Sequence, residues 1–323
     1  MEENNIKQNI LRFFEKSRGN YISGEEISNN LGMSRANIWK HINALRQEGY
    51  MIDAVPNIGY KLLMIPDKLQ GYEIKNGLET STMGQHIYYY DYITSTNDKA
   101  YELAENGAKE GTIIVAETQS GGKARLERKW ISPLGGIYMS IILRPVVNIE
   151  EIPAVTLVSA LSVSKTITSL YNLKAEIKWP NDIFINSQKI CGILAEMKGH
   201  VDKVDFVILG IGININTAIN DLPPNSTSIK TLTKNIANRV IFAREFLKQF
   251  ESDYTQFINE GFKSLKNECA ELSTLIGKKV NIKMHNTILS GLALGIDDKG
   301  ALIIKNELGD MKRVLSGDVL MCR

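Results

Sequence analysis

Five short polar motifs, each adjoining a predicted strand, lie between residues 95 and 216 and constrain the fold more than any other feature of the chain. They combine glycines, cations and amides, and such groups can hold an anion because backbone N–H groups and a guanidinium both face its oxygens. Together they predict a site for an activated acid and a phosphate. The motifs are Ser95-Thr96-Asn97, Gln119-Ser120-Gly121-Gly122-Lys123-Ala124-Arg125, Lys178-Trp179-Pro180-Asn181-Asp182, Lys189-Ile190-Cys191-Gly192 and Gly210-Ile211-Gly212-Ile213-Asn214.

Residues 1–64 predict a winged helix-turn-helix domain. Apolar residues recur at helical spacing in the first segment, and Ser23 and Ser34 can cap a second and a third helix. A Gly-Met pair makes the turn between those two helices. Two short extended runs follow, 50–55 and 60–63, and the Pro-Asn-Ile-Gly sequence between them is a hairpin signal.

The remainder is expected to form two more domains, since 323 residues suffice for two or three. Residues 65–86 look like a linker and entry segment. Strands and helices then alternate, which predicts a mixed sheet in a catalytic domain at 65–271, with long helices at 153–170 and 238–257. Short strands and turns after Leu272 predict a small β-barrel at 272–323.

Composition narrows the class of protein. A formal net charge of +2 gives, by itself, no argument for a nucleic-acid or membrane partner. The three cysteines are scattered and form no zinc or redox pattern, which favours a reducing cytoplasm. The first residues lack the apolar core of a signal peptide, and no apolar stretch is expected to approach the length of a membrane span. The four histidines lie far apart and suggest no metal site.

Each motif taken alone has an ordinary structural explanation. Ser95-Thr96-Asn97 can be a helix N-cap, and the basic loop after Gln119 can be exposed without a ligand. Lys189 can be a solvated hairpin lysine, and the glycines at 210 and 212 can mark a bulge. These glycines are not a dinucleotide fingerprint, because the third glycine and the following helix are missing. The functional interpretation rests on the set.

The set resembles, motif by motif, the biotin–protein ligases. Their adenylate loop usually reads Gly-Arg-Gly-Arg-x-Gly-Arg-x-Trp, and the Lys-Trp-Pro-Asn-Asp stretch matches them fully. In the loop the matching residues are Arg125, Arg128 and Trp130, and the departures are Lys123 for an arginine and Ala124 and Glu127 for glycines. Lysine keeps the charge but loses bidentate geometry, and the two other residues restrict φ where glycine was free.

The resemblance covers nearly the whole chain and implies an α+β multidomain fold. Its parts are a winged helix, a central mixed α/β ligase domain of the class II synthetase-like, biotin/lipoate ligase type, and a small SH3-like β-barrel. This is the layout of bifunctional ligases that double as biotin repressors.

The implied reaction has two steps. The biotin carboxylate attacks the α-phosphorus of Mg·ATP, giving biotinyl-5′-AMP and pyrophosphate, and a lysine on a biotin carboxyl carrier domain then attacks the mixed anhydride. No enzyme nucleophile is needed, so positioning and charge stabilisation do most of the work. The glycines of the last motif are expected to allow close approach of the ligand, and the loop at 217–225 to close over the adenylate.

The resemblance also assigns roles to residues. The expected catalytic charges are Arg125, Arg128, Lys178 and Lys189, and Asp182 is expected to help hold Mg²⁺. The expected biotin contacts are Ser95, Thr96, Asn97, Gln119, Gly122, Lys123, Arg125, Lys189, Gly192 and Leu194. The expected ATP and adenylate contacts are Arg125, Arg128, Trp130, Asn181, Gly210, Gly212 and Asn214.

The winged helix implies operator DNA as a second partner. The third helix carries basic residues and no acidic one, and its predicted DNA contacts are Ser34, Arg35, Asn37, Lys40 and His41. The domain through Met64 has eight lysines and arginines against seven acidic residues, a net charge of only +1, so a helix-turn-helix used purely for packing is the alternative. A homodimer is expected when the adenylate is bound, and no membrane partner.

Two other functions stay open at this point. A lipoate–protein ligase shares the catalytic fold, although the Lys-Trp-Pro-Asn-Asp stretch and the added winged helix favour biotin. A ligand-sensing transcription regulator without catalysis is the alternative from another class. Release of pyrophosphate on adding biotin and ATP would separate an enzyme from such a regulator.

Overall fold

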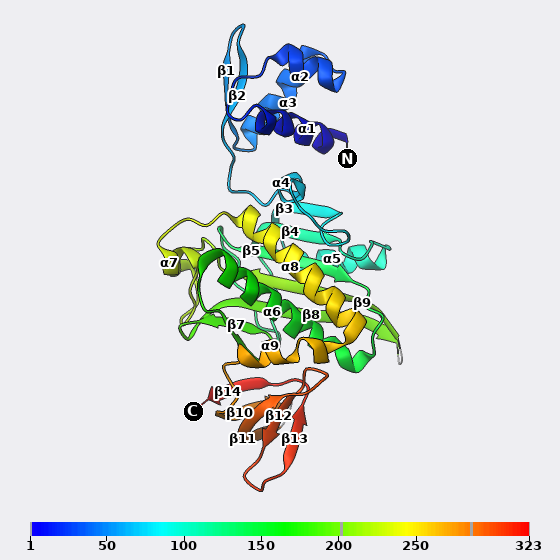
Figure 1. Ribbon diagram of the computed structural model, residues 1–323, viewed down its shortest axis with the longest axis vertical. Coiled ribbons are helices and arrows are strands. Elements are labelled where there is room, and N and C mark those ends of the chain that lie inside the picture. Colours follow the sequence, from blue (N-terminus) through cyan, green and yellow to red (C-terminus); the bar gives the residue numbers. More distant parts are fainter. Residues whose placement is uncertain (1, 201–202, 285–286, 323) are drawn as a thin grey trace. The chain divides into compact units, whose positions relative to one another are not determined.

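The computed structural model describes residues 2–200, 203–284 and 287–322 (Figure 1). The chain divides into two compact units, Met1–Asn76 and Gly77–Arg323. The chain has a single division between compact units, after Asn76, so the domain boundaries expected at residues 64 and 271 stay predictions.

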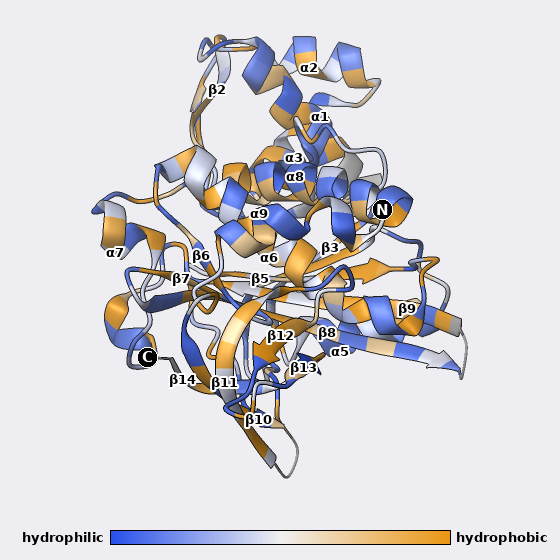
Figure 2. Cartoon of the chain, turned by 60° about the horizontal axis from the view of Figure 1, so that its bottom comes forward, coloured by the Kyte–Doolittle hydropathy of each residue, from blue (hydrophilic) through white to orange (hydrophobic). Residues whose placement is uncertain are grey.

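The N-terminal unit has the predicted winged helix-turn-helix plan. The side chains of Ser23 and Ser34 accept hydrogen bonds from the backbone of Glu26 and Asn37, so both predicted helix caps are present. Helix α2 is mostly hydrophilic (Figure 2), and its two hydrophobic residues, Ile27 and Leu31, lie one turn apart, as expected of a helix with one face on a core. The elements are α1 (Glu2–Lys16), α2 (Gly24–Leu31), α3 (Arg35–Gln47), the hairpin strands β1 (Met51–Val55) and β2 (Gly59–Met64), and α4 (Gly71–Lys75).

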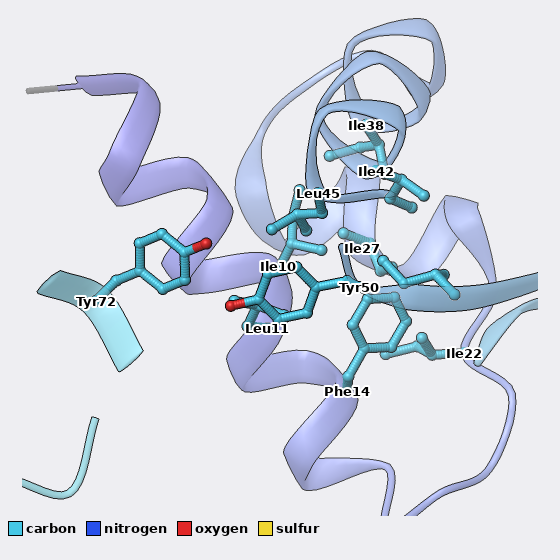
Figure 3. Packing of buried hydrophobic residues seen from close by; sticks show 11 residues of the cluster. Ile10, Leu11, Phe14, Ile22, Ile27, Ile38, Ile42, Leu45, Tyr50 and Tyr72 are labelled. Carbon is cyan, nitrogen blue, oxygen red and sulfur yellow. The ribbon is translucent and has the colours of Figure 1, made fainter. Parts of the chain in front are cut away.

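The core of this unit includes a helix from the segment that was expected to be a linker. Tyr72 of α4 lies near Tyr50, with ring centroids 6.4 Å apart, beside the apolar side chains of the three main helices (Figure 3). Its hydroxyl donates to Glu48 at 2.8 Å, and Glu48 also pairs with Lys7 at 2.6 Å. These contacts hold α4 on the winged helix.

The second unit is built on the predicted mixed sheet. Within the described residues it has seven strands in the order β3-β4-β5-β9-β8-β7-β6, and only β3 and β4 pair in parallel. The strands are β3 (Ile87–Ile93), β4 (Ile113–Gln119), β5 (Ile137–Leu143), β6 (Glu176–Lys178), β7 (Asp182–Ile185), β8 (Gln188–His200) and β9 (Lys203–Ile213). Every residue of β5 is buried, as in the middle of a covered sheet.

Helices cover both faces of this sheet. The long helices α6 (Ile152–Tyr171) and α8 (Arg239–Glu260) lie side by side across one face (Figure 1). Helix α5 (Thr96–Glu105) packs through Ala100 and Ala104 on Ile114, Ile142 and Ile208, whose side chains alternate with those facing α6 and α8. Two short helices, α7 (Ile229–Thr233) and α9 (Lys266–Glu271), complete the unit.

One helical segment contradicts the expectation that no apolar stretch approaches the length of a membrane span. The segment Ile149–Tyr171 is long and apolar enough to cross a membrane by length and composition. However, 78% of its most apolar window is buried inside the protein, which is the environment of a core helix.

The C-terminal strands form an open sheet. The strands β10 (Lys279–Met284), β11 (Thr287–Ile296), β12 (Leu302–Lys305), β13 (Met311–Val314) and β14 (Asp318–Cys322) are antiparallel in the order β13-β12-β11-β10-β14. In the described part of the chain no ladder joins β13 to β14, so the SH3-like barrel that was expected is not closed. Closure needs paired edge strands, and the short turn from β13 to β14 instead leads to the opposite edge of the sheet.

Candidate active site

All five motifs meet at one cavity of about 710 Å³ in the second unit. That volume lies in the usual range for a small-molecule site. The predicted residues that line it are Ser95, Thr96, Asn97, Gln119, Lys123, Arg125, Arg128, Trp130, Lys178, Asn181, Asp182, Lys189, Gly192, Leu194, Gly210, Gly212 and Asn214. Gly122 lies outside this lining, and its Cα faces Trp130 and Ser132, where an added Cβ would lie 2.6 Å from the Trp130 carbonyl oxygen.

A buried hydrogen-bond chain runs along one wall of the cavity from the start of α5. Ser95 caps that helix, and the backbone N–H and hydroxyl of Thr96 donate to the Gln119 side-chain carbonyl at 2.7 and 3.0 Å. The Gln119 amide then donates to Ser132 at 3.0 Å. Each polar group has a fixed partner, so the orientation of the Gln119 amide is set before a ligand binds.

Asn97 is held from three sides. Its amide nitrogen donates to Glu196 at 2.6 Å, and its oxygen accepts from Ser140 at 2.6 Å. The side chain fits only because residue 210 is glycine, since a Cβ there would lie 2.1 Å from the Asn97 oxygen. Glu196 also pairs with Lys123, and Lys123 pairs with Asp98 at 2.5 Å.

Ser140 and Glu196 were not assigned a role from the sequence. Ser140 is a single polar residue inside an otherwise apolar strand, and that interruption is the one signal that could have indicated it. Glu196 ends the alternating part of a long strand and gave no such signal. The hydrogen bond that Lys123 donates to Asp98 raises the pKa of Lys123, so its ammonium stays charged through neutral pH.

Two glycines make room for the indole of Trp130. A Cβ on Gly192 or Gly212 would lie 2.7 or 2.4 Å from the ring, and the Nζ of Lys189 lies 5.4 Å from the ring centroid. In this structure both glycines make room for the side chain of Trp130, and the close approach of a ligand to the glycines of the last motif stays a prediction. Its indole forms part of the cavity wall.

The basic loop folds into a small hairpin. Lys123 bridges Lys129, the Ala124 N–H donates to the Arg128 carbonyl at 3.0 Å, and the Arg128 N–H donates to the Arg125 carbonyl at 3.3 Å. The two central residues, Leu126 and Glu127, have φ of 56° and 58°. Positive φ at both centres is the requirement of a type I′ turn, which strongly favours glycine at the second centre.

Cations of the cavity are balanced by carboxylates of the same chain. Lys189 pairs with Asp182 at 2.7 Å, and Arg128 pairs with Asp318 at the start of β14. Asp318 was not predicted, because only the tertiary fold brings the C-terminal sheet to this loop. The Nζ of Lys178 lies 5.4 Å from the Phe184 ring and has no carboxylate partner within the described ranges.

Arg125 is a half-buried cation at the cavity. Its guanidinium donates to the Asn181 side chain and to the Gly317 carbonyl, both at 3.0 Å. Burial lowers the pKa of this guanidinium, which nevertheless stays charged near neutral pH. Neutral oxygens hold it in place, so its charge remains available to an anion in the cavity.

The Lys-Trp-Pro-Asn-Asp motif forms the turn between β6 and β7. The Trp179–Pro180 bond is cis, and the Trp179 side chain is buried with its N–H donating to the Gly300 carbonyl at 3.1 Å. Asn181 donates to the Ile193 carbonyl at 2.9 Å. The motif therefore combines one core residue with Lys178, Asn181 and Asp182 at the cavity.

Helix α3 presents most of the predicted DNA contacts to solvent. Ser34, Arg35, Asn37 and Lys40 are exposed. The prediction that His41 contacts DNA is corrected, because its side chain is only 8% exposed and lies on the buried side of the helix, one turn from Ile38. We therefore remove His41 from the set of proposed DNA contacts.

Three separate parts of the chain match known protein families. Residues 89–214 match the biotin/lipoate A/B protein ligase family, residues 7–61 a helix-turn-helix domain, and residues 275–321 the C-terminal domain of biotin protein ligases. The bifunctional ligase/repressor BirA of Bacillus subtilis is 40% identical over 97% of this chain and 98% of its own length. This chain belongs to the biotin–protein ligase family.

Other members agree with that assignment. BirA of Escherichia coli, also a bifunctional ligase/repressor, is 29% identical over 99% of this chain and 98% of its own length. The structure of biotin protein ligase from Aquifex aeolicus in complex with biotin and ATP superposes with a TM-score of 0.64 at 29% identity, covering 74% of this chain and 99% of that one. The expected fold and family are thus confirmed, whereas the individual site residues stay predictions.

Proposed function

We propose that this chain is an ATP-dependent biotin–protein ligase that also acts as a biotin-responsive repressor. The observation that carries the ligase function is the convergence of five motifs, separated in sequence, on a single cavity. The biotin carboxylate attacks the α-phosphorus of ATP and pyrophosphate leaves. A carrier-domain lysine then attacks the carbonyl of biotinyl-5′-AMP, and AMP leaves.

The hydrogen-bond chain at the start of α5 is the proposed biotin end of the cavity. A ureido ring presents two N–H donors and one carbonyl acceptor, so it needs partners of both kinds. The hydroxyls of Ser95 and Thr96 and the amide of Gln119 supply them, and their orientations are already fixed. Fixed partners lower the entropy lost on binding, which favours both affinity and alignment of the carboxylate.

The cations form the proposed phosphate end. Arg125 and Lys189 approach the cavity from two different motifs and would stabilise the negative charge that grows on the α-phosphoryl group. Arg128 and Lys178 would hold the remaining phosphates. Because Lys189 and Arg128 already pair with carboxylates, the nucleotide exchanges one set of charge-assisted contacts for another.

Magnesium is a proposed companion of ATP. Within the described residues no three acidic, histidine or cysteine side chains gather into a metal site. One carboxylate is nevertheless enough, because Mg²⁺ is commonly held by one or two carboxylates and the phosphates of its nucleotide. Asp182 lines the cavity and is the carboxylate placed to assist.

A substrate test separates this proposal from its alternatives. The protein should release pyrophosphate when given biotin and MgATP, and release little with lipoate in place of biotin. Equal release with lipoate would favour a lipoate ligase, whose family model is shared. No release with either acid would favour a regulator without catalysis.

The repressor function rests on the exposed, acid-free surface of α3. A single winged helix makes few phosphate contacts, so specific binding should need two copies on a two-fold operator. Residues 222–226 border the cavity, and ordering them over the adenylate would favour a homodimer. Such coupling between ligand and DNA is typically worth about 1–3 kcal/mol.

The test of repression is the affinity for DNA upstream of biotin-synthesis or biotin-uptake genes. Biotin plus ATP should tighten binding to that DNA about 5- to 150-fold, the range that corresponds to such coupling. No sequence preference in either state would leave the winged helix as a packing or catalytic accessory. We place both activities in the cytoplasm, where ATP and a carboxylase carrier domain occur together.

A further inference from the structure

The most exposed tryptophan among the described residues lies on α3. Trp39 is 57% exposed, whereas Trp179 is 2% exposed and Trp130 is half-buried in the cavity wall. A tryptophan contributes most free energy when its ring is buried. One exposed apolar side chain needs no explanation by itself, so the surroundings of Trp39 decide whether it has a partner.

The face around Trp39 suits a nucleic-acid duplex. Ala36, one helical turn earlier, is small and exposed, which leaves the ring open to approach. Lys40 is adjacent and Arg35 begins the helix, and in the described part of the chain neither has an ion-pair partner. Arg46, by contrast, donates to the Ile52 carbonyl at 3.0 and 2.8 Å and is used inside the domain.

The helix therefore offers two kinds of contact side by side. The cations can contact phosphates, which position a protein but carry no sequence information. The indole can contact base edges, and the apolar group that a base presents in the major groove is the thymine methyl. Trp39 lies in the N-terminal half of α3, where a recognition helix usually contacts bases.

We propose that Trp39 is a sequence-discriminating residue of the DNA-binding helix, which contacts thymine methyl groups in the major groove of the operator. This inference rests on the proposed repressor function. Lys40, its neighbour, makes a phosphate contact that is independent of sequence. The pair thus divides specificity and affinity between two adjacent side chains.

The experiment uses the full-length protein with biotin and MgATP. The parent is first used to select its preferred sequence from a pool of random duplexes. Affinities are then measured for that duplex, for copies with single thymines replaced by uracil, and for an unrelated duplex, over a range of salt concentrations. The variants are Trp39→Ala and, as the matched control, Lys40→Ala, and pyrophosphate release confirms that both are folded and active as ligases.

We expect uracil at one or two thymines to weaken parental binding about fourfold each, the factor that corresponds to one buried methyl-sized group. Trp39→Ala should weaken binding to the selected duplex by about tenfold or more and abolish the preference for thymine over uracil. Its affinity for the unrelated duplex should not change. Lys40→Ala should weaken binding to all duplexes alike and reduce the salt slope by about 1.

Three results would overturn the inference. A Trp39→Ala variant that keeps the thymine preference of the parent would exclude the base contact, although the repressor function would stand. A variant that fails to dimerise without DNA would make Trp39 a protein–protein contact instead. A parent that selects no sequence would refute the repressor function and this inference together.

Discussion

Glu127→Gly should slow the release of biotinyl-5′-AMP. Glu127 is the second central residue of the type I′ turn in the basic hairpin, with φ of 58°. A left-handed conformation costs a non-glycine residue about 1–2 kcal/mol. Glycine removes that cost but loses about 0.5–1 kcal/mol through the greater freedom of the open chain. The closed hairpin should therefore gain about 0.5–1 kcal/mol.

We infer that the adenylate leaves only when this hairpin opens, so that gain corresponds to a dissociation rate about two- to fivefold lower. The assay forms labelled adenylate on the enzyme from biotin and ATP, and follows its loss after addition of excess unlabelled adenylate. Glu127→Gln is the matched control, since it removes the negative charge and keeps the strained backbone.

Release from Glu127→Gly that is as fast as, or faster than, release from the parent would show that the strained turn does not limit retention of the adenylate. If Glu127→Gln slows release as much as Glu127→Gly does, the charge and not the backbone is responsible. Leu126→Asn offers a second check, because asparagine favours the first centre of this turn type and should also slow release.

Three further predictions follow from the cavity. Arg125→Ala and Lys189→Ala should each lose a charge-assisted contact of about 1.5–3 kcal/mol and slow pyrophosphate release about 10- to 150-fold, and a normal rate in both would contradict their assignment. Gly212→Ala should displace the Trp130 indole, because its Cβ would lie 2.4 Å from the ring, and should therefore change the KM for ATP. An unchanged KM for ATP would show that the indole does not contact the nucleotide. Glu196→Gln should raise the KM for biotin more than it changes kcat, since it weakens the hydrogen bond that holds Asn97. A fall in kcat/KM for ATP as large as the fall in kcat/KM for biotin would point to a general loss of structure.

Local signals predicted much of the fold. The caps at Ser23 and Ser34 and the alternation of strands and helices act within a few residues, so the sequence displays them directly. Helix α4 was missed because five residues form no stable helix alone, and it is Tyr72 packing on the core that holds it. The burial of His41 could have been predicted, because it lies three residues after Ile38 on the same face.

The candidate site, like the fold, could be predicted from the sequence only in part. Motifs identified the residues that line the cavity, since each is contiguous in the sequence. Glu196 and Asp318 were missed because their partners, Asn97 and Arg128, lie 99 and 190 residues away. The sequence also gave no sign that Asn97 fills the space beside Gly210, because only the fold brings the two residues together.

The most direct test of the central claim is transfer of biotin to a carrier domain. The purified protein is incubated with biotin, MgATP and the biotin carboxyl carrier domain of a carboxylase, and the carrier is examined by mass spectrometry. We predict the mass gain of one biotinyl group on the target lysine, no gain when that lysine is replaced by arginine, and a greatly reduced rate with Lys189→Ala. An unmodified carrier in the presence of active, folded protein would contradict the assignment as a biotin–protein ligase.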